Sequence, residues 1–423
     1  MTDAASEDTG RGAENEGGEE AAGGVYSFNV GVEAEAAGRE PPKSFVALRR
    51  DLAVLPWVLA GPGDIVLAPP PRPRFLASLR DAGVTGLPAF VERVPRGRAV
   101  AGHRPYGVPG EHMRRSAVAR YRSDVSVCRS MAEVRQAVAA HHKAVLKAEF
   151  SSSGLGVRVC EGAAALEPGA PLEKWVQDCL QQDGALTVEP WMDVLAEVTA
   201  EWLNGAWMSV SQPIVTQMRW EGQWLGDPVD GGMCREAADF VFKERAVEAA
   251  LAKLEVPATC GAETCGMDIA IVRATGGCGK PRGQGVLPFL EVRVLELNAR
   301  TTMSHYAQAA KSRLFCGSDD GRVAQKFVVA RLSEFAGLGP DVVPLTDPET
   351  ASMFVACILV SRTGGSTRRE RGRGATEATR EWLRLVALGW ANAAAISVGL
   401  CEEKGCDLRC CPQPGVVSHD IAH

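Results

Sequence analysis

The sequence predicts a small α/β domain followed by a longer α+β region. In residues 43–83, two amphipathic helical segments enclose a short apolar strand at 64–68, and this alternation is typical of an α/β unit. In residues 130–160, a helix precedes two strands that are joined by a loop of serine and glycine. In residues 186–298, long strands alternate apolar and polar side chains around an Asn204-Gly205 turn, which is a strong hairpin signal.

Length and composition limit the classes of protein to consider. The chain has 423 residues, enough for two or three domains with cores of their own. Its net charge of −6 argues against a nucleic-acid-binding or membrane-surface protein. We see no signal segment and no apolar run long enough to span a bilayer. The 13 scattered cysteines are expected to be reduced thiols, which favours a cytoplasmic protein.

Four regions are expected along the chain. Residues 1–24 are rich in Gly, Glu and Ala and are expected to form a disordered acidic tail. Residues 25–124 are expected to form the α/β domain and residues 125–325 the α+β region. Beyond about residue 330 the patterns weaken, and residues 326–423 are expected to be a C-terminal extension, partly helical and partly disordered.

The first candidate site is a lysine on a strand that leads into a glycine loop. Lys147 lies in the predicted strand 144–148, and the loop 151–156 includes Ser153, Gly154 and Gly156. A lysine suits phosphate oxygens, and glycines let backbone N–H groups approach them closely. The strand that follows makes this a hairpin and not a Walker site. The alternative is a surface lysine beside a tight turn.

The second candidate site is a short segment between two strands. Glu189-Pro190-Trp191-Met192 ends one strand, and Glu197 lies on the polar side of the next. Two carboxylates around such a linker can line a pocket for a planar ring and a ribose, with the ring bound by backbone groups. The alternative for Glu197 is a carboxylate that simply faces solvent.

The third candidate site combines two neighbouring strands. Glu296 and Asn298 are two residues apart and therefore share one face of a strand, and Asp268 on the preceding strand can join them. Oxygen ligands of this kind suit Mg²⁺ that bridges substrate phosphates. Arg300, two residues further, would add a fixed positive charge. The alternative is the solvated face of a hairpin.

In this order, the three groups resemble the ATP-grasp superfamily, which includes D-alanine–D-alanine ligase and biotin carboxylase. The resemblance covers residues 64–314, and its most specific part is the segment 295–303, LELNARTTM, which is similar to the E-x-N-x-R ending of the grasp domain. It implies a pre-ATP-grasp α/β domain followed by a two-lobed ATP-grasp domain whose lobes hold ATP between them.

The resemblance also implies a role for each candidate residue. ATP would be bound by Lys147, Ser153, Gly154, Gly156, Glu189, Pro190, Met192 and Glu197. Mg²⁺, with Mn²⁺ as the alternative cation, would be held by Asp268, Glu296 and Asn298. Arg300 and Lys147 would stabilise the transferred phosphoryl group.

Some features depart from the family pattern or stay outside it. Many members carry a further lysine upstream, where this chain offers Arg115 or Arg120. The hairpin between Asp268 and Glu296 is longer than usual. The cysteines at 401–411 lack the paired spacing of a zinc site, and His305 is interpreted as an ordinary helix residue.

The resemblance implies an ATP-dependent carboxylate–amine ligase, or a carboxylate–thiol ligase. An acid would be activated as an acyl-phosphate and captured by an amine. The partners expected are therefore ATP and small-molecule acid and amine substrates. Two alternatives stay open: a phosphotransferase whose phosphorylated product is released, and a non-catalytic nucleotide-binding protein of the same fold.

Overall fold

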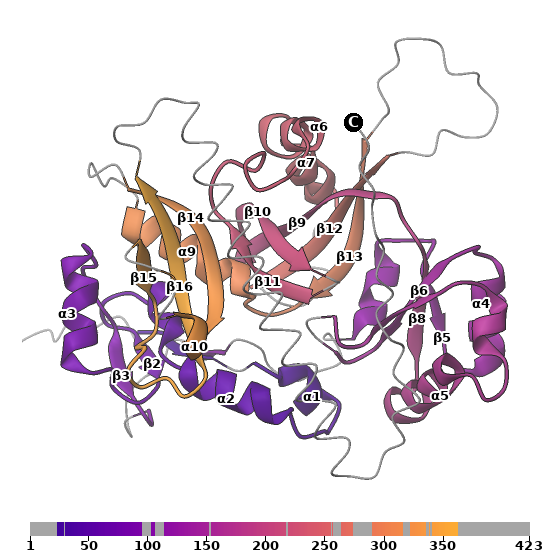
Figure 1. Cartoon of the computed structure of the whole chain (residues 1–423), viewed down its shortest axis with the longest axis horizontal. Helices are drawn as coiled ribbons and strands as arrows, with labels where there is room; N and C mark the ends of the chain where they lie inside the picture. The colour runs from indigo at the N-terminus through magenta and orange to yellow at the C-terminus, as the bar shows by residue number, and fades with distance from the viewer. Residues whose placement is uncertain are drawn as a thin grey trace, which may run out of the picture.

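A computed structural model shows three β-sheets with helices packed around them (Figure 1). It describes residues 23–28, 30–94, 103–105, 114–151, 154–216, 219–254, 256, 264–273, 290–315, 322–335, 338 and 341–362. The segment 1–22, the glycine-rich segment 274–289 and the cysteine-rich end of the chain lie outside these residues. No helix in the described ranges is both long enough and apolar enough to cross a membrane.

The N-terminal domain is built on a four-stranded parallel sheet in the order β3-β2-β1-β4. The strands are β1 (Val25–Ser27), β2 (Ile65–Leu67), β3 (Ala89–Val91) and β4 (His103–Pro105). The helices are α1 (Val32–Ala36), α2 (Lys43–Asp51), the 3₁₀ helix η1 (Leu55–Val58) and α3 (Pro73–Asp81). The end of the expected tail joins this sheet, since the N–H of Gly24 donates to Asp64 at 2.7 Å.

The first lobe is an antiparallel sheet covered by two helices. Its order is β5-β8-β6-β7, with β5 (Ser126–Cys128), β6 (Ala144–Ala148), β7 (Val157–Cys160) and β8 (Leu186–Pro190). The helices are α4 (Met131–Ala139) and α5 (Pro171–Asp183), and the 3₁₀ helices η3 (Arg115–Arg120) and η4 (Ala163–Leu166) flank them. Ser130 caps α4 by accepting from the N–H of Glu133. Gly184 ends α5 in the left-handed conformation.

The second lobe belongs to an eight-stranded antiparallel sheet in the order β13-β12-β9-β10-β11-β14-β16-β15. Its first five strands in this order are β13 (Leu290–Asn298), β12 (Cys265–Arg273), β9 (Val194–Leu203), β10 (Ala206–Thr216) and β11 (Arg219–Trp224). The turn between β9 and β10 is the predicted one: Asn204 and Gly205 have φ of 53° and 77°.

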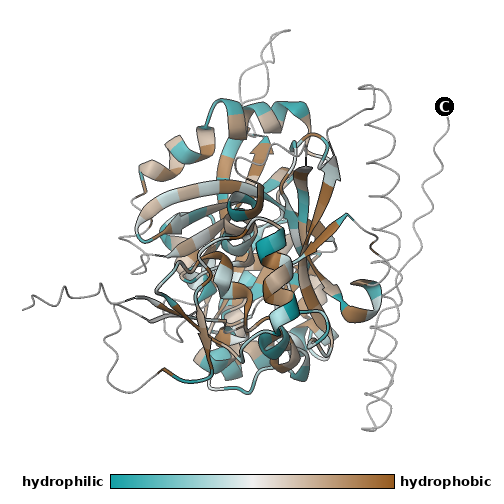
Figure 2. Ribbon diagram, turned by 90° about the vertical axis from the view of Figure 1, so that its left-hand side faces the viewer, coloured by the Kyte–Doolittle hydropathy of each residue, from teal (hydrophilic) through white to brown (hydrophobic). Residues whose placement is uncertain are grey.

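Helices cover this sheet and fix its position. The π-helix η5 (Asp239–Lys243) follows α6 (Arg235–Ala238), and α7 (Ala246–Ala252) completes this layer. The longer α9 (Met303–Phe315) follows β13 after a short connection. Figure 2 shows hydrophobic stretches on the strands and alternating polar and apolar residues on the outer helices, as expected for elements with one buried face.

The region after residue 322 differs from the expectation. The expected boundary at 325/326 falls inside β14 (Arg322–Arg331), which is followed by the short helix α10 (Leu332–Phe335), β15 (Val342–Pro344) and β16 (Phe354–Arg362). These strands complete the eight-stranded sheet. Strands with both faces buried lack the alternation that marks a half-exposed strand, which is why the sequence pattern looked weak here.

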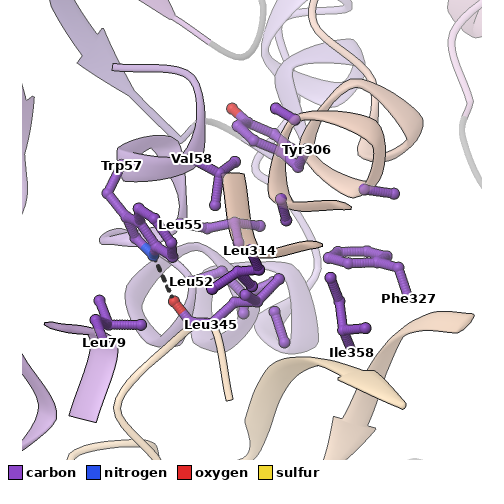
Figure 3. Close-up of a cluster of buried hydrophobic side chains, with 14 of the residues drawn as sticks. Leu52, Leu55, Trp57, Val58, Leu79, Tyr306, Leu314, Phe327, Leu345 and Ile358 are labelled. Carbon is purple, nitrogen blue, oxygen red and sulfur yellow. Dashed lines mark hydrogen bonds between the residues drawn. The ribbon is translucent and has the colours of Figure 1, made fainter. Parts of the chain in front are cut away.

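The largest core joins the N-terminal domain to these last strands (Figure 3). Trp57 of η1 is fully buried, and its indole N–H donates to the carbonyl of Leu345 at 2.9 Å. Tyr306 of α9 and Phe327 of β14 belong to the same core. The N-terminal domain therefore packs against the eight-stranded sheet and α9 through an apolar interface.

Candidate active site

A cavity of about 540 Å³ lies between the first-lobe sheet and the eight-stranded sheet. The two sheets contribute facing side chains to it, and the N-terminal domain contributes residues near α1. Among the residues predicted from the sequence, the structure brings these to the cavity: Lys147, Gly154, Glu189, Pro190, Met192, Glu197, Asp268, Glu296, Asn298 and Arg300. The three candidate sites thus form one site.

Two predicted loop residues stand apart. Ser153 lies outside the described residues. Gly156 is buried and is not among the residues that line the cavity, so its assignment as an ATP-binding residue stays a prediction. A Cβ at Gly156 would collide with the side chain of Ser151, so this glycine is required for the turn to close. Gly154 does line the cavity, and its φ of 74° suits glycine.

Lys147 and Glu189 form a buried pair on the first-lobe sheet. Register places Val145 opposite Glu189, so Lys147 and Glu189 lie diagonally on one face. The Lys147 Nζ lies 2.8 Å from Glu189 Oε1 and donates to the carbonyl of Leu295 at 2.9 Å. Leu295 is the extra residue of a bulge in β13, and that bulge turns its carbonyl to the lysine. An ammonium has three donors, so one remains for a ligand.

Arg122 was missed by the sequence reasoning, and it completes this pair. Its Nη1 donates to Glu189 Oε2 at 2.7 Å and to the carbonyl of Val294 at 3.1 Å. The Arg122 and Glu189 side chains are each 2% exposed. Both carboxylate oxygens of Glu189 are therefore paired, one with Lys147 and one with Arg122. Only the backbone of Glu189 is available to bind adenine.

Of the two arginines offered in place of the upstream lysine, Arg115 lines the cavity, whereas Arg120 is exposed and does not line it. Arg115 is 5% exposed, and its Nη2 lies 3.2 Å from Glu296 Oε2. Among the described residues, its Nε and Nη1 have no hydrogen-bond partner. Buried guanidinium donors without partners are costly, so this edge of Arg115 suits an anionic ligand in the cavity.

The candidate metal ligands face one another across adjacent strands. Asp268 is opposite Glu296 in register and opposite Thr199 on its other side. Thr199 Oγ1 donates to Asp268 at 2.9 Å, and Asn298 Nδ2 donates to its other oxygen at 3.1 Å. Burial, first, and the neighbouring Glu296 carboxylate raise the pKa of Asp268 to about 6.

This arrangement fits a divalent cation that takes only some of its ligands from the protein. No three His, Cys, Asp or Glu side chains gather as a metal cluster in the part of the chain that the structure describes. The site offers two carboxylates and an amide oxygen. That donor set is incomplete for a structural metal, but it suits Mg²⁺ that also binds waters and phosphate oxygens. The repulsion between the two carboxylates would be relieved by such a cation.

The other end of the cavity is more apolar. Val145 and Val157 of the first-lobe sheet line it together with the segment 190–194. The ring of Trp191 is 47% exposed and lies 4.3 Å from the Lys143 Nζ. Glu197 also lines this end. Burial raises the pKa of its carboxyl overall, and the positive charge of Lys147 offsets part of that rise.

Arg300 is held by a residue that the sequence reasoning missed. Its Nε and Nη2 lie 2.9 and 2.6 Å from Glu33 Oε1, and its Nη1 donates to the carbonyl of Thr301 at 3.3 Å. Glu33 belongs to α1 of the N-terminal domain, 267 residues away. No sequence pattern links these two residues, because the contact depends on how the domains pack.

A buried polar network lies beneath the site. Glu201 is fully buried and accepts from Ser211 at 2.7 Å and from Ser304, and burial raises its pKa to about 7. His305 is fully buried: its Nδ1 accepts from the N–H of Thr302 at 3.1 Å, and its Nε2 faces the carbonyl of Trp202 at 3.1 Å. Burial lowers the pKa of His305 to about 4. It therefore serves the helix start, in agreement with the prediction that it is an ordinary helix residue.

Comparisons with known proteins give distant likenesses. Neither a family model nor a curated protein sequence matches the chain. The chain is similar to an ADP complex of N5-carboxyaminoimidazole ribonucleotide synthetase, at 12% identity and a TM-score of 0.42, over 85% of this chain and 94% of that chain. It is similar to an ATP complex of biotin carboxylase from Campylobacter jejuni, at 11% identity and a TM-score of 0.36, over 59% of this chain and 61% of that chain. It is similar to the ATP-grasp ligase PsnB bound to a minimal precursor, at 18% identity and a TM-score of 0.25, over 56% of this chain and 53% of that chain.

These three likenesses all have TM-scores below 0.5. The arrangement within the chain itself is clear: a parallel α/β sheet comes first, and two antiparallel lobes then enclose the cavity. This agrees with the predicted fold class, a small α/β domain followed by two α+β lobes.

Proposed function

We propose that this protein is an ATP- and Mg²⁺-dependent ligase that activates a carboxylate and transfers the acyl group to an amine or a thiol. The observation that carries the proposal is the convergence on one cavity of two buried cations, Lys147 and Arg115, with the carboxylates Asp268 and Glu296. Cations and paired carboxylates at one place are the requirements for holding a magnesium–polyphosphate.

ATP would lie along the first-lobe sheet. Its adenine would fit between the valines at the apolar end, with the Pro190 carbonyl and the Met192 N–H at its edge and Glu197 near the ribose. Its phosphates would meet Lys147, the open edge of Arg115 and the backbone near Gly154. These donors suit phosphate oxygens because they are charged, buried and fixed by neighbouring groups.

The metal ligands would complete the phosphate site. Asp268, Glu296 and Asn298 would hold Mg²⁺, which, when bound, offsets the negative charge of the phosphates. The substrate carboxylate would attack the γ-phosphorus, and ADP would leave. Lys147, Arg115 and Arg300 would stabilise the charge that develops during this step, since phosphoryl transfer depends mainly on positioning and electrostatics.

The second half of the reaction would use the same cavity. The amine nitrogen would attack the acyl carbon, and inorganic phosphate would leave together with a proton from the amine. The far end of the cavity has room for such substrates beside Val215, Trp220 and Met303. An apolar wall would also exclude water, which would otherwise hydrolyse the acyl-phosphate.

The test is a screen of carboxylate and amine libraries for ADP release, with mass spectrometry of the product. We expect ADP release that requires both an acid and an amine or thiol, and that is lost in Asp268→Asn. Release that needs an acid or alcohol alone, with a phosphorylated product, would contradict the ligase and favour a phosphotransferase. Tight MgATP binding without turnover on any pair would favour a non-catalytic protein.

A further inference from the structure

The position of Arg300 poses an electrostatic problem for the metal site. Arg300 follows Asn298 by two residues and lines the same cavity as Asp268, where its positive charge opposes the overall rise in the pKa of that carboxyl. A guanidinium pairs readily with carboxylates through its flat fork. If Arg300 turned toward Asp268 or Glu296, it would compete with a divalent cation for the same oxygens.

In the structure, Glu33 holds Arg300 in another direction. One carboxylate oxygen of Glu33 binds both the Nε and the Nη2 of Arg300, at 2.9 and 2.6 Å, and Nη1 donates to the carbonyl of Thr301. The two side chains are only 8% and 9% exposed, so water screens the pair weakly. Every nitrogen of the guanidinium thus has a contact other than Asp268, Glu296 or Asn298.

The position of Glu33 is itself fixed by its surroundings. Val32 is fully buried against Phe150, next to the strand that carries Lys147. Arg39, just after α1, donates to the carbonyl of Phe150 at 3.0 Å and lies 3.3 Å from Asp183. The segment with Glu33 is therefore anchored to the first lobe, and Glu33 reaches the cavity from a rigid element.

We propose that Glu33 is a positioning residue that holds the Arg300 guanidinium away from Asp268, Glu296 and Asn298, and so keeps these ligands accessible to a divalent cation. This proposal rests on the proposed function, because it takes these three residues as the metal ligands. Glu33 acts through Arg300 and needs no contact with the metal.

The test is a double-mutant cycle on Mn²⁺ affinity, measured by the electron paramagnetic resonance signal of free Mn²⁺. Glu33→Gln removes the charge that holds Arg300, so the guanidinium turns to the carboxylates and Mn²⁺ affinity falls about tenfold. Arg300→Gln removes the competing charge, so this variant should bind Mn²⁺ at least as tightly as wild type. The double variant Glu33→Gln/Arg300→Gln should recover to within about threefold of wild type, because no guanidinium is left to compete.

The control lies on the same helix. Glu35 pairs with Arg49 at 2.6 Å, outside the cavity, and Glu35→Gln should leave Mn²⁺ affinity unchanged. Circular dichroism and urea unfolding confirm that each variant is folded. Mn²⁺ binding by Glu33→Gln as tight as by wild type would overturn the proposal. So would a double variant as weak as Glu33→Gln, since this would indicate general damage. Absence of Mn²⁺ binding by wild type would overturn the metal assignment itself, and this proposal with it.

Discussion

Arg122→Met tests how Lys147 remains available for a ligand. Arg122 is one of two cations that share the buried carboxylate of Glu189. Without Arg122, Glu189 has Lys147 as its remaining cation, and the carboxylate holds the ammonium more tightly. We therefore expect weaker MgATP binding by about tenfold, although Arg122 does not line the cavity. A charge-assisted hydrogen bond worth about 1.5–3 kcal/mol supports this magnitude.

The same substitution should also destabilise the fold. The Arg122 and Glu189 side chains are each 2% exposed, and Arg122 also binds the Val294 carbonyl at 3.1 Å. Removing one partner of such a buried pair costs about 3–5 kcal/mol, because the other charge stays buried. Urea unfolding measures this loss. Arg135→Met is the matched control, since Arg135 is 44% exposed and lies 3.8 Å from Glu173, where about 1 kcal/mol or less is expected.

A second variant separates charge from packing. In Arg122→Met/Glu189→Gln the buried carboxylate that has lost one of its two cations is gone, so more than half of the lost stability should return. A loss below about 1 kcal/mol for Arg122→Met, or a double variant less stable than Arg122→Met, would refute the reasoning about the buried pair. Unchanged MgATP affinity in a folded Arg122→Met would refute its link to Lys147.

Two further predictions concern the same region. The pKa of Glu201 is raised to about 7, so the folded state keeps a proton that the unfolded state loses near pH 4.5, and the free energy of unfolding falls as pH rises between these values. Between pH 5 and pH 8, the free energy of unfolding of wild type, measured with urea, should fall on the order of 3 kcal/mol more than that of Glu201→Gln. The same pH dependence in both proteins would contradict the burial of this acid. Asn298→Ala removes an amide from the proposed metal site but leaves the apolar end of the cavity intact. It should raise the Mg²⁺ concentration needed for ATP binding about tenfold, and an unchanged Mg²⁺ requirement, measured by fluorescence titration, would remove Asn298 from the ligand set.

Local patterns predicted much of the fold and the site. The turn at Asn204-Gly205 needs positive φ at both residues, and the Asn-Gly pair predicts this because these two residue types adopt positive φ readily. Alternation along β13 places Glu296 and Asn298 on one face, and register brings Asp268 to the same place. Such features depend on neighbours in sequence or on adjacent strands, so one sequence is enough to find them.

Contacts between distant segments were not predictable in the same way. Glu33 meets Arg300 only because the N-terminal domain packs beside the cavity, and Arg122 meets Glu189 only because the segment before β5 lies beside β8. A single charged residue looks the same whether it is solvated or paired. The strands β14 and β16 were missed for another reason: Phe327 and Ile358 lie in runs buried on both faces, where period-2 alternation is absent.

The most direct test of the central claim is calorimetric titration of ATP into wild type and Lys147→Met, each with Mg²⁺ and with a chelator. Lys147→Met keeps the length and apolar stem of the side chain but removes the charge that lies 2.8 Å from Glu189 and faces the cavity. We predict binding by wild type that is tighter with Mg²⁺, and binding by folded Lys147→Met that is weaker by about tenfold to a hundredfold. Wild type that binds no ATP under either condition, or Lys147→Met that binds it as tightly as wild type, would contradict a nucleotide site between the lobes.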